Sequence, residues 1–355
     1  MAIKILGDIV SVVSEHISNP SKSGYHIFVG LEHYDSGEPV ITRHGSTEQL
    51  ESSVKHFIEG DILVARRNVY LKRAGVVNFE GVTSGDSIVL RVKEEKYKDI
   101  IPFILNTDDF WDYAEQNSDG TMSKRLAPDV LLEYECNIPE NHQSIADKLW
   151  AAYKLKVSYK QMITATDEMV KSQFIEMFGN LDTNIKSYPV TTVEKISLNL
   201  FAGGDKPEDT STERTDKYIY PVWANGEGER GLMGYSKTYR VDKEALTISA
   251  RGTIGYCAIR EPYFTPIVRL ITLIPNEKVD IVYLKYFFDQ TGFESTGAVQ
   301  GQLTIPTIKV KKVLVPPIEE QMKFAEVVKQ ADKSKFELRK SIEAIDAVIK
   351  SLING

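Results

Sequence analysis

Residues 301–355 read GQLTIPTIKVKKVLVPPIEEQMKFAEVVKQADKSKFELRKSIEAIDAVIKSLING, and this stretch determines the architecture that we predict. Apolar residues recur from Phe324 onward at alternating steps of four and three, a spacing that places them along one seam of a coiled-coil helix. Only Lys335 interrupts the seam. The pattern predicts a long helix whose seam includes Phe324, Val328, Leu338, Ile342, Ile345 and Ile349.

The same seam occurs 179 residues earlier, with Lys156 at the step that Lys335 occupies. Polar positions recur as well, since Asp167 corresponds to Asp346. We expect both lysine stems to lie along the seam with their ammonium groups in water, and a role in fixing the register is the alternative. The chain therefore contains two copies of one unit, and the earlier seam includes Ile145, Leu149, Tyr159, Ile163 and Val170.

Composition is typical of a soluble globular protein, because 42% of the 355 residues are hydrophobic and 26% are charged. The two cysteines, Cys136 and Cys257, are far apart and form no CxxC motif, so we expect neither a disulfide nor a zinc site. No apolar run reaches the ~18 residues that a membrane span requires. We therefore expect a cytoplasmic protein without a membrane contact.

Short, β-branched apolar runs separated by Gly, Asn and Asp precede each long helical pattern. The predicted fold class is α/β (mixed α+β), with two pseudo-repeated domains joined by two long antiparallel coiled-coil helices. We place the domains at residues 1–138 and 180–316 and the helices at 139–179 and 317–355. Expected strands are 25–29, 61–65, 87–92, 217–223, 246–250, 266–274 and 308–315, and expected helical stretches outside the long helices are 99–116 and 282–289.

Catalytic motifs are scarce. Residues 202–206 (AGGDK) lack the spacing of a phosphate-binding loop, and no glycine-rich turn for a dinucleotide or S-adenosylmethionine is present. Asp86, Glu94 and Lys96 resemble the carboxylates and lysine of a magnesium-dependent nuclease. A solvated, charged strand end is the simpler interpretation, so we assign no catalytic and no metal-binding residue. A stand-alone nuclease or methyltransferase-associated enzyme that uses this trio remains the alternative.

Candidate DNA contacts are more coherent, although a net charge of −7 argues weakly against nucleic acid. Arginine can fork onto guanine, asparagine can pair with adenine, and lysine binds phosphate. Donor-rich side chains gather in turns between expected strands, at corresponding places of both copies. In the first copy they are Arg66, Arg67, Asn68, Tyr70, Lys72, Arg73, Lys124 and Arg125, and in the second they are Asn225, Arg230, Lys237, Tyr239, Arg251, Thr253, Gln300 and Gln302.

Three segments of the second copy resemble the specificity subunit of type I restriction-modification systems. They are residues 250–255 (ARGTIG), 301–303 (GQL) and 315–321 (VPPIEEQ), the last of which opens the final helix. The resemblance covers essentially the whole chain, because the order domain, helix, domain, helix is that of the family. The first half is a weaker copy, with residues 138–142 (IPENH) where PIEEQ stands in the second.

The resemblance implies a non-catalytic subunit that serves DNA methylation and host defence. Its two target recognition domains would each read half of a split double-stranded DNA site, and its helices would dock two methyltransferase subunits and hold the half-sites apart. A helix of about 57 Å suits half-sites roughly one DNA turn apart. Restriction (helicase-nuclease) subunits complete that family's assembly. S-adenosylmethionine, ATP and Mg would belong to those partners, and this chain would bind no cofactor. A scaffold that binds a methyltransferase without reading DNA is a further alternative.

Overall fold

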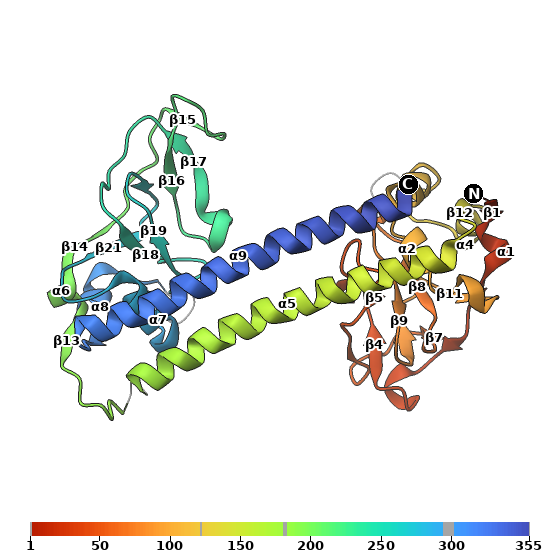
Figure 1. Ribbon diagram of the computed structural model, residues 1–355, viewed down its shortest axis with the longest axis horizontal. Coiled ribbons are helices and arrows are strands. Elements are labelled where there is room, and N and C mark those ends of the chain that lie inside the picture. The colour runs from red at the N-terminus through yellow and green to blue at the C-terminus, as the bar shows by residue number, and fades with distance from the viewer. Residues whose placement is uncertain (1, 121–122, 180–182, 294–301, 355) are drawn as a thin grey trace. The chain divides into compact units, whose positions relative to one another are not determined.

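A computed structural model describes residues 2–120, 123–179, 183–293 and 302–354. The chain divides into two compact units, which we describe separately. Unit 1 comprises Met1–Lys160 and Arg339–Gly355, and unit 2 comprises Gln161–Leu338. Two long helices, α5 (His142–Phe178) and α9 (Ile318–Asn354), each begin in one unit and end in the other (Figure 1).

Unit 1 contains two five-stranded sheets and a two-stranded ribbon, so the expected mixture of α and β is confirmed. The first sheet has the strand order β2-β11-β8-β9-β5, the second has the order β3-β7-β10-β4-β6, and β1 pairs with β12. The strands are β1 (Ala2–Ile5), β2 (Val10–Val13), β3 (His16–Ile17), β4 (Ile27–Val29), β5 (Val40–Ile41), β6 (Gly45–Ser46), β7 (Val54–Phe57), β8 (Ile62–Ala65), β9 (Ala74–Val77), β10 (Gly81–Thr83), β11 (Ser87–Val92) and β12 (Glu135–Ile138).

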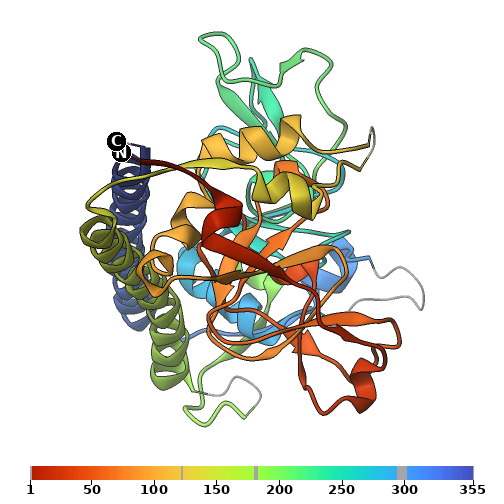
Figure 2. The ribbon, with the colours of Figure 1, turned by 90° about the vertical axis from the view of Figure 1, so that its right-hand side faces the viewer.

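Residues of strand β8 alternate between two cores, as the period of two in a strand requires. Ile62 and Val64 face the core that contains the start of α5 and the end of α9, whereas Leu63 and Ala65 face the second sheet. Figure 2 shows α5 and α9 along one side of the strands of unit 1. The short helices of this unit are α1 (Leu6–Ile9), α2 (Ile101–Ile104), α3 (Asp108–Gln116) and α4 (Pro128–Leu132).

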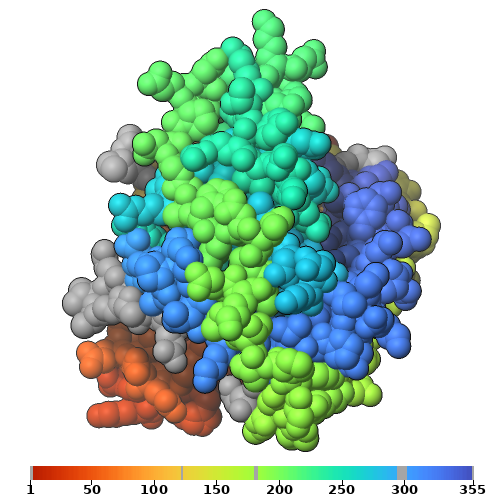
Figure 3. Space-filling model, turned by 90° about the vertical axis from the view of Figure 1, so that its left-hand side faces the viewer, coloured from red at the N-terminus to blue at the C-terminus, as the bar shows by residue number. Residues whose placement is uncertain are grey.

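Unit 2 repeats the order of unit 1 with four-stranded sheets. The first sheet runs β14-β21-β18-β19, the second runs β15-β17-β16-β20, and β13 pairs with β22. Figure 3 shows green to teal residues, the part of the chain that includes β15, β16 and β17, projecting from the rest of this unit. The elements are β13 (Val190–Thr192), α6 (Val193–Ile196), β14 (Ser197–Ala202), β15 (Thr210–Ser211), β16 (Tyr220–Trp223), β17 (Leu232–Ser236), β18 (Ala245–Ile248), β19 (Cys257–Arg260), β20 (Thr265–Pro266), β21 (Ile271–Pro275), α7 (Ile281–Thr291), α8 (Ile305–Lys309) and β22 (Lys312–Leu314).

The expected strand at residues 308–315 is partly wrong, because residues 305–309 form helix α8 and only Lys312–Leu314 are a strand. Thr304 caps this helix: its hydroxyl accepts a hydrogen bond from the Thr307 amide at 3.5 Å, and Pro306 lies in the first turn. A threonine cap followed by proline is a helix start. The β-branched residues that follow concealed this signal.

Seam residues of α5 and α9 meet in each unit. Ile145 and Leu149 share a core with Ile349 in unit 1, and Val170 shares a core with Phe324 in unit 2. None of the predicted seam positions is exposed among the described residues. In the part of the chain that the structure describes, no helix is long and apolar enough to cross a membrane.

The two seam lysines do not reach water as expected. The Lys156 ammonium lies 2.6 Å from Asp346 in unit 1, and that of Lys335 lies 2.7 Å from Asp167 in unit 2. Both lysine side chains are only 11% exposed. Because Asp346 and Asp167 also correspond through the repeat, the two ion pairs are copies of one contact. Each ion pair joins one residue of α5 to one residue of α9 and so favours one register of the two helices. Register fixing was the alternative interpretation of the two lysines.

Candidate nucleic-acid interface

The candidate residues of unit 1 lie on two neighbouring segments at the end of the first sheet. Loop A, defined as residues 66–73, joins β8 to β9, and segment A, defined as residues 123–125, passes beside it. The Asn68 amide donates a hydrogen bond to the Lys124 carbonyl at 3.0 Å. Asn68 and Lys72 adopt positive φ angles of 55° and 48°, which turn the loop sharply on both sides of a short helical turn.

Arg67 and Arg125 are brought together by one carboxylate. Their guanidinium groups each lie 3.6 Å from a different oxygen of Asp86, which directly precedes β11. Arg67 Nε also donates to the Ser123 hydroxyl at 3.0 Å, and that hydroxyl donates to Asn68 Oδ1 at 3.2 Å. The four polar side chains around Asp86 thus form one network that leaves both arginines about half exposed.

Other candidates of unit 1 stabilise loop A. Arg73 donates to the carbonyls of Leu31 and Arg67, at 2.9 and 3.1 Å, and Lys124 donates to the end of helix α3. Lys72 pairs with Asp108 at 2.7 Å. Lys350 and Lys72 together hold the pKa of Asp108 at about 2, well below its usual range. Tyr70, in contrast, is 59% exposed at the tip of loop A.

The matching site of unit 2 is built on loop B, defined as residues 249–256, between β18 and β19. Arg251 donates to Gln302 Oε1 at 3.0 Å. Asn225 holds the start of the loop, because its Oδ1 accepts from the Ala250 amide at 2.7 Å and its Nδ2 donates to the Val268 carbonyl at 2.8 Å. Gly252 has a φ of 70°, a conformation that favours glycine.

A shared backbone hydrogen bond relates the two sites. The Leu126 amide donates to the Arg66 carbonyl at 2.8 Å in unit 1, and the Leu303 amide donates to the Ala250 carbonyl at 3.1 Å in unit 2. Both leucines are buried in the core next to the long helices. Leu126 and Leu303 precede α4 and α8 by the same number of residues. Arg66 therefore corresponds to Ala250.

Arg66, the first arginine of loop A, is therefore not the counterpart of Arg251. Side chains alternate along a strand, so a shift of one places a residue on the opposite face. Arg67 is the counterpart of Arg251, and Arg125 is the counterpart of Gln302. Each unit consequently presents one pair of adjacent polar side chains at the same place.

The remaining candidates of unit 2 are not part of the pair formed by Arg251 and Gln302. Lys237 contacts Asp209 at 2.6 Å, and Tyr239 packs against the rings of Tyr220 and Tyr263. Arg230 follows Asn225 on the turn beside loop B and is exposed, as is Thr253 within loop B. Gln300 lies outside the described residues.

The nuclease-like trio is not assembled. Asp86 and Glu94 flank opposite ends of β11, whose six residues span about 20 Å. Glu94 and Lys96 pair with each other at 2.5 Å, and their side chains are about half exposed. No group of three or more His, Cys, Asp or Glu side chains among the described residues is arranged to hold a metal ion. Asp86 instead belongs to the arginine network.

Two further residues belong to the site. The sequence suggests a metal-ligand role for Asp86, whereas in the structure Asp86 lies between the guanidinium groups of Arg67 and Arg125. Lys55, on strand β7, donates to the Ser87 carbonyl at 2.7 Å beside this network. Burial and the nearby charge of Arg66 lower the pKa of Lys55. Neither residue has a local sequence signal, because each joins the site through a strand that pairs far along the chain.

Part of the chain is similar in sequence to proteins of one known family. Residues 198–346 match the family model of the type I restriction modification DNA specificity domain. A putative type I specificity subunit of Mycoplasma pneumoniae is 35% identical over 134 residues, which cover 38% of this chain and 40% of that protein. The sequence match thus spans about two fifths of the curated relative.

Solved structures share the fold over nearly the full length. The crystal structure of a type I restriction-modification S subunit from M. genitalium has a TM-score of 0.59 at 15% identity, covering 99% of this chain and 94% of that chain. A structure from a study of complex assembly and conformational transition of the type I restriction-modification system has a TM-score of 0.58 at 14% identity, covering 99% and 96%. At these identities the likeness concerns the fold.

Proposed function

We propose that the whole chain is the specificity subunit of a type I restriction-modification complex, because residues 198–346 match the family model of the type I restriction modification DNA specificity domain. Residues 1–138 and 180–316 would be its two target recognition domains, each reading one half of a bipartite double-stranded DNA site. The subunit itself is non-catalytic in this proposal. One observation carries the proposal: each unit has exposed hydrogen-bond donors on an equivalent loop, loop A in unit 1 and loop B in unit 2, at the end of its first sheet.

The long helices have a separate role in this proposal. Residues 139–179 and 317–355 would form an antiparallel coiled coil that separates the two half-sites and docks two methyltransferase subunits. Restriction subunits would join the same complex. S-adenosylmethionine, ATP and Mg would then be bound by these partners. In support, seam residues of the two helices meet in both units, since Leu149 shares a core with Ile349 and Val170 shares a core with Phe324.

Selection from random duplexes tests the proposal. We expect the chain, assembled with its methyltransferase subunits, to enrich two short conserved half-sites separated by a fixed number of unspecified base pairs. Methylation mapped by sequencing should fall within those half-sites. Enrichment of a single uninterrupted motif, or of none, would contradict the proposed function.

A matched deletion tests the spacer within the same experiment. Removing residues 158–164 from α5 and 338–344 from α9 leaves Lys156, Asp167, Lys335 and Asp346 in place. Each helix shortens by about 10 Å, or about three base pairs of duplex. We expect a shorter spacer with both half-sites unchanged. Deletion from α5 alone is the control, because it breaks the register of the pair and should abolish binding.

A further inference from the structure

We propose that two side-chain pairs determine the specificity: Arg67 with Arg125 in unit 1, and Arg251 with Gln302 in unit 2. The proposal rests on the proposed function and identifies which of the candidate residues read bases. The two pairs occupy equivalent positions beside the hydrogen bond that the units share, from a buried leucine amide to the carbonyl at the end of a strand. In each pair one residue follows that carbonyl in sequence, and the other precedes that leucine. Most other candidates in these loops have a structural task.

The first pair retains the donors that base reading requires. Arginine has five N–H donors, and two of them can fork onto O6 and N7 of guanine. The 3.6 Å separations between Asp86 and the two guanidinium groups exceed a hydrogen bond. Asp86 therefore orients both groups electrostatically without saturating their donors. Asp86 is a positioning residue, and the half-site of unit 1 should contain guanine.

The second pair has a different chemistry at the same place. Gln302 Oε1 accepts one hydrogen bond from Arg251, and a carboxamide oxygen has a second lone pair. That lone pair and the amide N–H groups match N6 and N7 of adenine. Arg251 keeps further donors for a guanine. The half-site of unit 2 should therefore contain guanine and adenine close together.

The neighbouring basic residues are distinguished by their contacts. Lys72 is engaged by Asp108, Lys124 by the backbone of Glu115, and Arg73 by two carbonyls of its own unit. Lysine has no planar fork, and both terminal nitrogens of Arg73 already donate to carbonyls. These side chains can therefore add positive charge beside phosphates but do not present a free fork to a base edge. Lys72 and Lys124 should contribute affinity that is independent of sequence.

Exchanging the pairs tests the inference in the assembled complex with its methyltransferase subunits. Arg125→Gln gives unit 1 the pair of unit 2, and Gln302→Arg does the reverse. We expect each variant to alter one or two adjacent positions of one half-site only, with discrimination changed by about tenfold to 100-fold. Arg125→Gln should replace a preference for guanine by one for adenine. The spacer and the other half-site should stay as in the wild type.

Matched variants separate the possible outcomes. Lys124→Gln removes the same charge as Arg125→Gln from the adjacent residue, and should weaken binding to all duplexes without changing the motif. If Arg125→Gln fails to fold, as judged by thermal unfolding, Arg125→Lys keeps the charge without the fork and should relax the preference for guanine. A wild-type motif in the exchange variants, or in a folded Arg125→Lys variant, would overturn the pair assignment. Absence of a bipartite motif in the wild type would overturn the proposed function instead.

Discussion

Units 1 and 2 contact the same two helices by different means. In unit 1 an apolar core is supplemented by polar contacts: Glu38, two residues before β5, lies 3.0 Å from Lys156 and 2.7 Å from Lys160 of helix α5. Trp150 of the same helix donates to the Asp99 carbonyl at 2.9 Å. Although burial alone would raise the pKa of Glu38, its two lysine partners outweigh burial and lower it.

In unit 2 the contact is aromatic. Phe174 and Phe178 of α5 pack against Phe324 of α9, with ring centroids 5.2 and 5.7 Å apart. Tyr283 and Tyr286 of α7 complete the cluster, at 4.8 Å from Phe178 and 5.1 Å from Phe324. The two units therefore share the helix seam and the strand order. They differ in the side chains that hold each unit to its helices, which include ion pairs in unit 1 and an aromatic cluster in unit 2.

Loss of an aromatic ring should have the largest effect. Phe324→Ala removes a fully buried ring from the cluster of unit 2, and we expect a loss of about 3–5 kcal/mol in the free energy of unfolding. Hydrogen exchange should increase in unit 2 before unit 1. Met322→Ala, at an exposed position of the same helix, is the control and should change little. Equal loss of protection in both units would show that the attachments do not differ as described.

The seam lysines should differ from each other. Lys156→Met leaves Glu38, whose side chain is only 16% exposed, with one partner fewer, at an expected cost of about 1–3 kcal/mol. Lys335→Met leaves Asp167 and Asp332, which are 47% and 62% exposed and can be hydrated. We expect less than about 1 kcal/mol there. Chemical unfolding of both variants measures the difference, and a larger cost at Lys335 would contradict the comparison.

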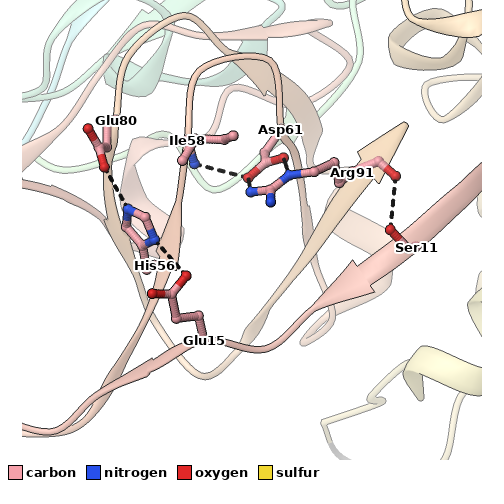
Figure 4. Close-up of polar contacts among 7 residues, drawn as sticks. All are labelled: Ser11, Glu15, His56, Ile58, Asp61, Glu80 and Arg91. Atoms are coloured by element: carbon pink, nitrogen blue, oxygen red, sulfur yellow. Dashed lines mark hydrogen bonds and ion pairs between the residues drawn. The ribbon is translucent and has the colours of Figure 1, made fainter. Parts of the chain in front are cut away.

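The second sheets should differ in their response to pH. His56 of unit 1 lies between Glu15 and Glu80, at 2.9 and 2.8 Å (Figure 4). The ring of Tyr25 packs against that of His56. Burial would lower the pKa of His56, but its two carboxylate partners outweigh burial and raise it above 6.5. The second sheet of unit 2 carries the tyrosine cluster at residues 220, 239 and 263 instead.

A group with a raised pKa stabilises the fold fully below its unfolded value, and this contribution is lost as the pH rises through the folded value. We therefore expect His56→Gln to destabilise unit 1 by about 1 kcal/mol below pH 6.5. The difference from the wild type should shrink at higher pH. Hydrogen exchange of peptides from each unit measures this, and a constant difference across the pH range would refute it. Unit 2 serves as the internal control.

Regular elements were predictable from the sequence where one period dominated. Apolar residues at helical spacing located α5, α9 and α7, and β-branched runs located β8 and β11. Helix α8 was missed because its β-branched residues follow a cap and a proline that only local hydrogen bonding explains. The spacing of apolar residues along the sequence is therefore enough to predict the long helices and the longer strands.

The site was predictable only as a set of loops. Basic and amide residues on turns indicated loop A and loop B, but the pairing of Arg67 with Arg125 depends on contacts between residues 58 positions apart. The role of Asp86 depends on strand β11 lying beside β8. Contacts of this kind arise from the sheet register, which a single sequence does not specify.

The crossing of α5 and α9 between the units affects how the protein is made. Ile349 and Leu352 pack against the core of unit 1, although more than 190 residues of sequence separate them from Val157, the preceding residue of that core. During translation the earlier part of unit 1 leaves the ribosome long before these side chains exist. The half that is synthesised first is consequently completed last, and a chaperone that shields its open apolar surface would act on the nascent chain in that interval.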